Sequence, residues 1–212
     1  EAQQMSKPKK SNPLKFLTKD LIEGIKYIFE SRTLVTVLIV TIIMNSLVFT
    51  YQSQLSVIVQ NNLSDLPIIL GVLAALEGLG ATFGTLLIAS FPFKRGIMIF
   101  LSGSFLFGFC IMAFAFSHSI SISIGLMILG GIGMAGFGTL QSILIISSAD
   151  QKIRGRVLGI LAITIGTQPI GAFLLGYFSR EYGSVTALKF SVFIAMVLLL
   201  FVTLLQINKK TS

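Results

Sequence analysis

Long apolar runs dominate the chain and are separated by short polar breaks. A helix needs about 20 residues to cross the hydrocarbon core of a bilayer. Each run reaches that length, and each break carries charged or turn-forming residues. The pattern therefore predicts an all-α membrane protein with six transmembrane helices, over residues 34–59, 67–90, 97–116, 122–147, 157–178 and 185–205.

A different periodicity precedes the first run. Asn12 is a suitable N-cap, and Pro13 follows at the first helical position. Apolar residues then recur at steps of three and four, with lysines and glutamates on the other faces. This pattern predicts an amphipathic helix on the cytoplasmic membrane surface. Its apolar positions are Leu14, Leu17, Leu21, Ile25 and Ile28.

These patterns divide the chain into four parts. A flexible basic linker is expected over residues 1–12 and the interfacial helix over 13–32. The six-span bundle follows over 33–207, and a short cytoplasmic tail over 208–212.

The composition agrees with a membrane location. Of 212 residues, 54% are hydrophobic and 11% are charged, whereas soluble domains have about 25% charged residues. Such an apolar surplus does not fit inside a water-soluble core. The composition excludes a disordered chain, a disulfide scaffold and an ordinary cytosolic enzyme.

The basic residues indicate an orientation. Sixteen Lys and Arg oppose eight Asp and Glu, for a net charge of +8. Fourteen of the sixteen lie on the side shared by the N-terminal segment, and only Arg180 and Lys189 lie opposite. By the positive-inside rule, both termini are expected in the cytoplasm of a cell membrane protein. The charge therefore indicates contact with the lipid bilayer rather than with nucleic acid.

One sequence motif matches a dinucleotide fingerprint. Gly131-Ile132-Gly133-Met134-Ala135-Gly136 fits G-x-G-x-x-G, but that site requires a preceding strand. Here the motif lies inside a predicted span. We expect the glycines of this span to let neighbouring backbones approach closely; they are Gly125, Gly130, Gly131, Gly133, Gly136 and Gly138.

Catalytic constellations are not apparent in the sequence. The one histidine, His118, lies in a short loop, and no Gly-x-Ser-x-Gly motif is present. No His or Cys pair has zinc-ligand spacing, and Cys110 is the one cysteine. The sequence therefore predicts neither an enzyme nor a bound cofactor or metal.

Glu77 is the acidic residue placed near the middle of a predicted span. A charge at that depth costs about 2.5 to 3.5 kcal/mol on insertion scales, so such residues face a bundle interior or a wet cavity. A carboxyl there avoids the cost by holding a proton, which makes Glu77 a proton-coupling candidate. The alternative is a structural carboxyl hydrogen-bonded to a neighbouring helix.

A polar stripe crosses the first predicted span. Thr41, Asn45, Gln52 and Ser56 follow at steps of four, seven and four, which keeps them on one face of an uninterrupted helix. They are candidates for lining a substrate pathway, or for hydrogen bonds to another helix.

The fifth span contains Gln168-Pro169, flanked by Gly166 and Gly171. Proline removes a backbone hydrogen bond and bends a helix. The predicted kink serves gating or structure alone, and Gln168 joins the pathway candidates.

The order of these features resembles the C-terminal half of a major facilitator superfamily transporter. The likeness is greatest to the branch of enterobactin exporters and macrolide-efflux proteins. The chain differs at Tyr51-Gln52-Ser53-Gln54, where that family often has prolines, and it lacks an acidic residue near Lys94-Arg95. The matching segments are Asp20-Leu21-Ile22-Glu23-Gly24-Ile25-Lys26-Tyr27-Ile28, Asn45, Leu70-Gly71-Val72-Leu73, Glu77-Gly78-Leu79-Gly80, Asp150, Arg154-Gly155-Arg156-Val157-Leu158-Gly159, Pro169-Ile170-Gly171, Gly176 and Gly183.

The resemblance implies a mechanism. Two six-helix bundles would rock about a midplane site, with Asn45, Gln52 and Glu77 facing the central cavity. Asp150, Arg154 and Arg156 would lie at the cytoplasmic closure, where the arginines pair with acids of the other half or serve as positive-inside anchors.

The sequence thus predicts a secondary transporter of a small-molecule substrate, working as a proton-coupled exporter. Because the family has twelve spans, we expect an N-terminal six-span half upstream of Glu1. Two alternatives remain open. The chain is a non-transporting membrane module, or a half-size transporter that pairs with a second copy of itself.

Overall fold

The computed structural model describes residues 13–63, 66–90 and 95–208, and within them it contains helices and no strand. The predicted linker over residues 1–12 lies outside the described residues. The same holds for the basic residues Lys94, Lys209 and Lys210, which contributed to the predicted orientation.

Six helical segments of the described chain are long and apolar enough to cross a membrane, as the hydropathy predicted. They extend over Arg32–Asn62, Pro67–Ala89, Gly96–Phe116, Ile120–Ser148, Arg154–Tyr182 and Ser184–Ile207. Four of them contain single continuous helices: α4 (Pro67–Ala89), α5 (Gly96–Phe116), α6 (Ile120–Ser148) and α9 (Ser184–Asn208).

The amphipathic helix α1 covers Pro13–Glu30 and ends two residues before the expected boundary. Ser31 alone separates it from the first span, because Arg32 already begins the next helix.

The first and fifth spans are interrupted near their middles. The first consists of α2 (Arg32–Ile43), the π-helical turn η1 (Met44–Val48) and α3 (Tyr51–Asn62). The fifth consists of α7 (Arg154–Ile165) and α8 (Gln168–Tyr182). The first span was expected to be continuous, so its interruption is a correction to the sequence analysis.

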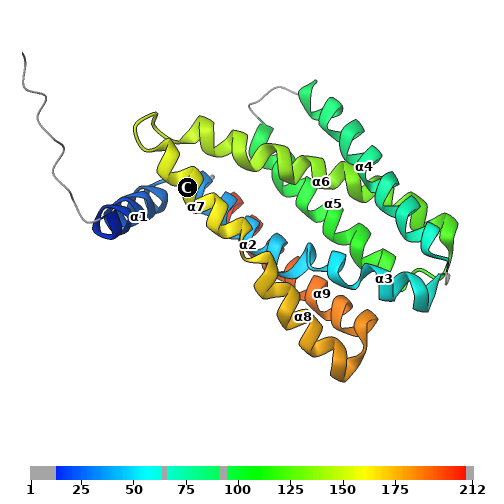
Figure 1. Ribbon diagram of the computed structural model, residues 1–212. Coiled ribbons are helices and arrows are strands. Elements are labelled where there is room, and N and C mark those ends of the chain that lie inside the picture. The colour runs from blue at the N-terminus through cyan, green and yellow to red at the C-terminus, as the bar shows by residue number, and fades with distance from the viewer. Residues whose placement is uncertain (1–12, 64–65, 91–94, 209–212) are drawn as a thin grey trace, which may run out of the picture.

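The six spans pack in space as two groups of three. One group contains the second, third and fourth spans, and the other contains the first, fifth and sixth. The first span packs mainly against the fifth and sixth, and the fourth span (α6) packs against the second and third (α4 and α5). Figure 1 shows the resulting groups, with α4, α5 and α6 side by side and α2 running beside α7 to α9. Contacts between α5 and α9 join the two groups.

Glycines allow α4 and α6 to pack at backbone distance. A Cβ atom at Gly131 would collide with the Glu77 carbonyl oxygen, and one at Gly80 with the Ile128 carbonyl oxygen. At Gly84 a Cβ would lie 2.9 Å from the Cβ of Ala135. Small residues at steps of four thus interlock, as membrane helices require when lipid supplies no hydrophobic drive.

The opposite side of α6 packs on α5 in the same way. A Cβ at Gly133 would lie 2.6 Å from the Phe107 nitrogen, and one at Gly136 3.1 Å from the Gly103 Cα. The fingerprint glycines therefore serve helix packing. Within the described bundle the prediction does not hold for Gly125 and Gly138, because a Cβ atom at either position would meet no neighbouring helix within 4 Å.

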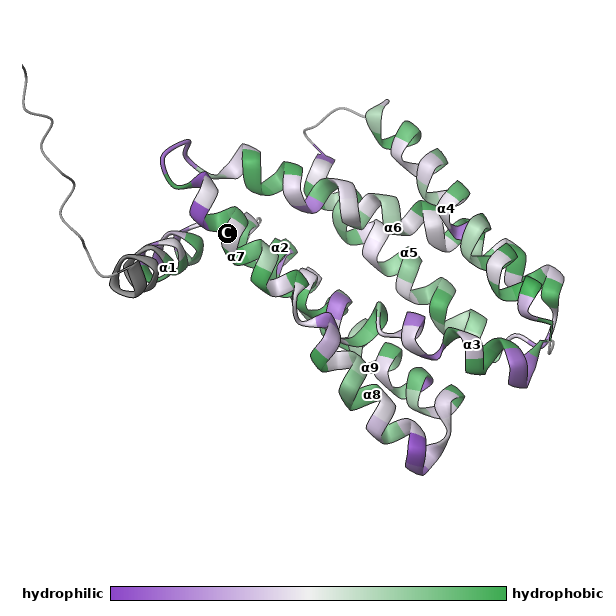
Figure 2. Cartoon of the chain, viewed as in Figure 1, coloured by the Kyte–Doolittle hydropathy of each residue, from purple (hydrophilic) through white to green (hydrophobic). Residues whose placement is uncertain are grey.

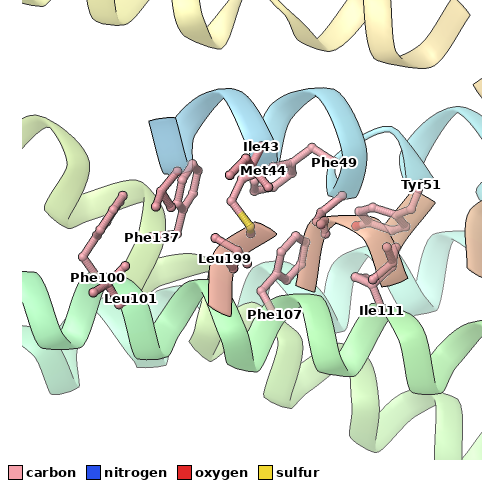
Figure 3. Close-up of a cluster of buried hydrophobic side chains, with 14 of the residues drawn as sticks. Ile43, Met44, Phe49, Tyr51, Phe100, Leu101, Phe107, Ile111, Phe137 and Leu199 are labelled. Atoms are coloured by element: carbon pink, nitrogen blue, oxygen red, sulfur yellow. The ribbon is translucent and has the colours of Figure 1, made fainter. Parts of the chain in front are cut away.

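An aromatic cluster joins the first, third and fourth spans (Figure 3). Phe49, in the turn after η1, lies 4.8 Å from the Phe107 ring and 5.5 Å from the Phe137 ring, measured between centroids. Phe137 in turn stacks on Phe100 at 5.6 Å. Each buried aromatic side chain removes a large apolar area from its surroundings, so Phe49 holds the interrupted span in the bundle.

Two features fix the turn into the last span. Gly183 adopts a φ of +81°, a conformation that suits glycine, and it connects α8 to α9 without further loop residues. A turn later, the Lys189 ammonium lies 3.8 Å from the centroid of the Phe116 ring at the end of α5. This cation–π contact lets a basic side chain near the end of a span avoid lipid.

The glycine packing gives a direct test. In Gly131→Ala the new methyl group meets the α4 backbone, and we expect a loss of about 1 to 3 kcal/mol in unfolding free energy. Gly138→Ala, on the same helix, meets open space and should leave stability unchanged. Thermal unfolding of the purified protein in detergent measures both, and equal stability of the two variants would contradict the packing.

Candidate functional site

The mid-membrane carboxyl has a partner on the first span. The Tyr51 hydroxyl donates to the Glu77 carboxylate and lies 2.6 Å from each of its oxygens. Tyr51 is fully buried, and Glu77 is 8% exposed. The Tyr51 ring also packs edge-on against Phe107. The arrangement satisfies a buried polar group whose isolation would be costly, and it ties α3 to α4.

The two interrupted spans meet at their breaks. The Gln168 amide nitrogen, at the start of α8, lies 3.3 Å from Gln52 Oε1 and 3.5 Å from the Phe49 carbonyl oxygen, and donates to both. Gly171 packs so closely on η1 that a Cβ there would collide with the Ser46 carbonyl oxygen. Pro169 lies in the first turn of α8, and Gly166 caps α7, so the gating candidates surround this junction.

A second polar group connects the first span to the fourth. The Thr41 hydroxyl lies 2.7 Å from the Val37 carbonyl oxygen and 3.3 Å from Gln141 Oε1. Asn45 donates from Nδ2 to the Thr41 carbonyl oxygen at 2.9 Å. Both Thr41 and Asn45 are buried, and the Thr41 hydroxyl and the Asn45 amide nitrogen have hydrogen-bond partners within the bundle.

The polar stripe of the first span does not lie on one face. Thr41 and Asn45 are buried, whereas Gln52 and Ser56 are exposed. The prediction assumed 3.6 residues per turn throughout, and the wider π turn followed by Phe49 and Thr50 changes the register. Gln52 and Gln168 form one polar cluster with the break, and Thr41 and Asn45 form another with Gln141.

The sixth span completes the set of contacts. The Ser191 hydroxyl donates to the Leu47 carbonyl oxygen of η1 at 2.7 Å, and Thr36 donates to Gln206 Oε1 at 3.0 Å. The first span therefore contacts every other span of the described bundle. Figure 2 shows hydrophilic residues at the ends of the bundle and also at the level where α2 gives way to α3.

An apolar cavity of about 390 Å³ adjoins the junction, between η1, α8 and α9. Ser46 and Leu47 of η1, Gly171 and Phe178 of α8, and Phe190 of α9 are among the residues that line it. The Ser46 hydroxyl donates a hydrogen bond to the Ile42 carbonyl oxygen. The cavity therefore presents apolar surface, in the size range of small-molecule pockets.

The candidate closure residues lie beside α1. Arg156 Nη1 pairs with Glu23 Oε2 at 2.5 Å, so this arginine has an acidic partner within the chain. Arg154 donates to the Ala149 carbonyl oxygen at 3.4 Å, and the Asp150 amide donates to the Tyr27 hydroxyl at 3.0 Å.

Sequence reasoning missed several members of the site. Tyr51 was noted only as a departure from a family pattern, and Gln141 and Ser191 were not considered. Comparing how far residues of the first two spans lie from their shared loop would have found Tyr51. Tyr51 and Glu77 each lie about three helical turns from that loop.

Within the described residues, no group of three or more His, Cys, Asp or Glu residues could hold a metal ion. A family model described as Major Facilitator Superfamily matches residues 3–167. No significant match was found among curated proteins or among solved structures.

The Tyr51–Glu77 bond is testable by single-atom changes. Tyr51→Phe removes the donor and leaves a buried carboxyl unsatisfied, which should cost about 1 to 3 kcal/mol in unfolding free energy. Glu77→Gln keeps an acceptor for the hydroxyl and should cost less.

Tyr177→Phe is the matched control, because Tyr177 is 61% exposed. Thermal unfolding in detergent compares the three variants with the unmodified protein. A Tyr51→Phe protein as stable as Tyr177→Phe would show that the bond contributes nothing to the bundle.

Proposed function

The chain belongs to the Major Facilitator Superfamily, a family of membrane transporters, and from this premise we propose that it works by alternating access. In this scheme its six spans form one bundle that rocks against another and exposes a mid-membrane site to each side in turn. The substrate is a small molecule, and the direction is export. The family match supports transport in general, and the direction rests on the likeness of the sequence motifs to efflux proteins.

The observation that carries the proposal is the meeting of two broken spans. Discontinuous helices occur at the substrate sites of transporters, where irregular backbone lines a cavity. Here η1 and the start of α8 contact each other, and Gln52 and Gln168 present amide groups beside them. The apolar cavity shares Ser46 and Gly171 with this junction and suits the apolar part of a small-molecule substrate.

Proton coupling is assigned to Glu77. Its carboxyl group accepts a hydrogen bond from Tyr51, the first residue of α3, directly after the break in the first span. Loss or gain of a proton changes whether this carboxyl accepts or donates, and therefore how α3 is held. Such a link would couple the charge of the site to the geometry of the junction.

The second bundle is expected to pack on α4 and α7. Each helix has exposed glycines where a Cβ atom would meet no neighbouring helix within 4 Å. They are Gly71 and Gly78 on α4, and Gly155 and Gly159 on α7. Faces of small residues suit close packing of membrane helices. We assign these faces to an N-terminal six-span half, or to a second copy in the half-size alternative.

Coupling is tested with the complete protein in proteoliposomes that enclose a pH-sensitive dye. A panel of small organic solutes is applied as gradients, and a transported solute should drive protons in the opposite direction. Glu77→Gln should abolish proton movement and leave the protein folded. Glu181→Gln, the same change at an exposed residue, is the control. Normal proton movement by the Glu77→Gln protein would refute the assignment.

The packing faces are tested by Gly78→Leu and Gly159→Leu in the complete protein. A Cβ at either position would meet no atom of a neighbouring helix within 4 Å, so the bundle itself should fold normally. Solute transport should fall, and in the half-size alternative a detergent-stable dimer should dissociate on size-exclusion chromatography. Full transport by both variants would place the second bundle elsewhere.

A further inference from the structure

The helix α1 presents three different faces around its circumference. One face contacts the bundle, through Glu23, Gly24, Tyr27 and Ile28. A second face is apolar and exposed, and a third carries exposed charged residues. At 100° per residue these sets occupy separate sectors, so each face is able to meet a different environment.

The bundle-facing sector is held by several contacts. The Glu23–Arg156 ion pair and the Asp150–Tyr27 hydrogen bond join α1 to α7 and to the loop before it. Gly24 packs so closely that a Cβ there would lie 2.8 Å from Ile160 Cδ1. Ile28 is 6% exposed and belongs to the bundle core. The helix is therefore fixed to the N-terminal end of the fifth span.

The apolar sector has no cover in the described chain. Ile22 is 56% exposed, Ile25 44% and Phe29 76%, and the three follow at steps of three and four. Since Ser31 alone separates α1 from the first span, this sector lies at the edge of the bilayer. An amphipathic helix in that position buries its apolar side about 5 to 10 Å into the headgroup region.

The charged sector of α1 carries both signs, with Lys26 and Glu30 exposed on it. Lys26 is exposed and lies at the border between the apolar and charged sectors, where a lysine side chain reaches lipid headgroups. Lys152 is exposed in the loop that Tyr27 contacts. Basic residues beside an inserted apolar face bind anionic lipids.

We propose that α1 is a lipid-anchored clamp on the fifth span. Its apolar sector inserts into a bilayer surface rich in anionic headgroups, and its opposite sector holds α7 through Glu23 and the loop before α7 through Tyr27. The surface thereby sets the position of the N-terminal end of α7, the segment that precedes the Gly166–Thr167 break. This inference does not depend on the transport activity.

These 212 residues lack tryptophan, so once any tryptophan outside them is replaced by phenylalanine, a single introduced tryptophan reports one position. Phe29→Trp probes the apolar sector, and Glu30→Trp, one residue later in the charged sector, is the control. The complete protein is placed in nanodiscs of phosphatidylcholine and phosphatidylglycerol with brominated acyl chains. We expect emission at shorter wavelength and at least about twofold stronger bromine quenching at position 29 than at position 30.

Two results would overturn the lipid contact. Equal quenching at both positions would place the apolar sector in water. Short-wavelength emission without bromine quenching would mean that protein covers it instead. Raising the phosphatidylglycerol fraction should increase quenching at position 29, and Lys26→Gln should remove most of that increase. An unchanged increase in Lys26→Gln would contradict the assigned role of this lysine.

The clamp is tested by cross-linking in a background with Cys110→Ser and with any cysteine outside these residues also replaced by serine. A Cβ at Gly24 would lie 3.5 Å from the Arg156 Cβ, within the range for disulfides. Gly24→Cys with Arg156→Cys should therefore cross-link under mild oxidation. The neighbouring control, Gly24→Cys with Gly155→Cys, should not, because nothing lies within 4 Å of a Cβ at Gly155. Equal cross-linking of both pairs would show that α1 is not held on α7.

Discussion

Every backbone polar group inside a bilayer must find its partner within the protein, and the interrupted first span makes this constraint severe. The carbonyl groups around η1 lie where the regular helical ladder fails. Ser191 reaches the Leu47 carbonyl oxygen and Gln168 reaches that of Phe49. The neighbouring spans must therefore stay close to the break, and the bundle is arranged around it.

Close packing of helices is the second half of the same problem. Because lipid tails are as apolar as leucine, helices associate through contact area and backbone proximity. Gly80 and Gly131 bring α4 and α6 together at the depth of Glu77, whose own carbonyl lies against Gly131. The backbone that bears the mid-membrane carboxyl is thus held by close helix packing on one side, and its side chain is hydrogen-bonded to Tyr51.

The sequence predicts the six spans because hydropathy over about 20 residues does not depend on tertiary detail. The break at Met44–Val48 was not predictable in that way, since no proline or glycine marks it and its support comes from residues far along the chain. The same limit applies to glycine. The sequence alone does not distinguish Gly131 from Gly138. Only the position of α4 shows that a side chain has no room at Gly131 and has room at Gly138.

Some candidate site residues are evident from the local sequence, and others only from the arrangement of the helices in space. Glu77 was evident because a charge in an apolar run is costly, whereas nothing in the sequence marked Tyr51 as its partner. The depth of two residues in adjacent spans is set by their shared loop, so their pairing follows from counting. Partners on non-adjacent spans, such as Thr41 and Gln141, require the helix order in space, and a single sequence does not supply it.

The tight connection at Gly183 has a mechanical consequence. Since one residue joins α8 to α9, the two helices form a stiff hairpin without slack at its tip. The same hairpin reaches α5 through the cation–π contact between Lys189 and Phe116. The fifth, sixth and third spans are therefore connected in series at this end of the bundle.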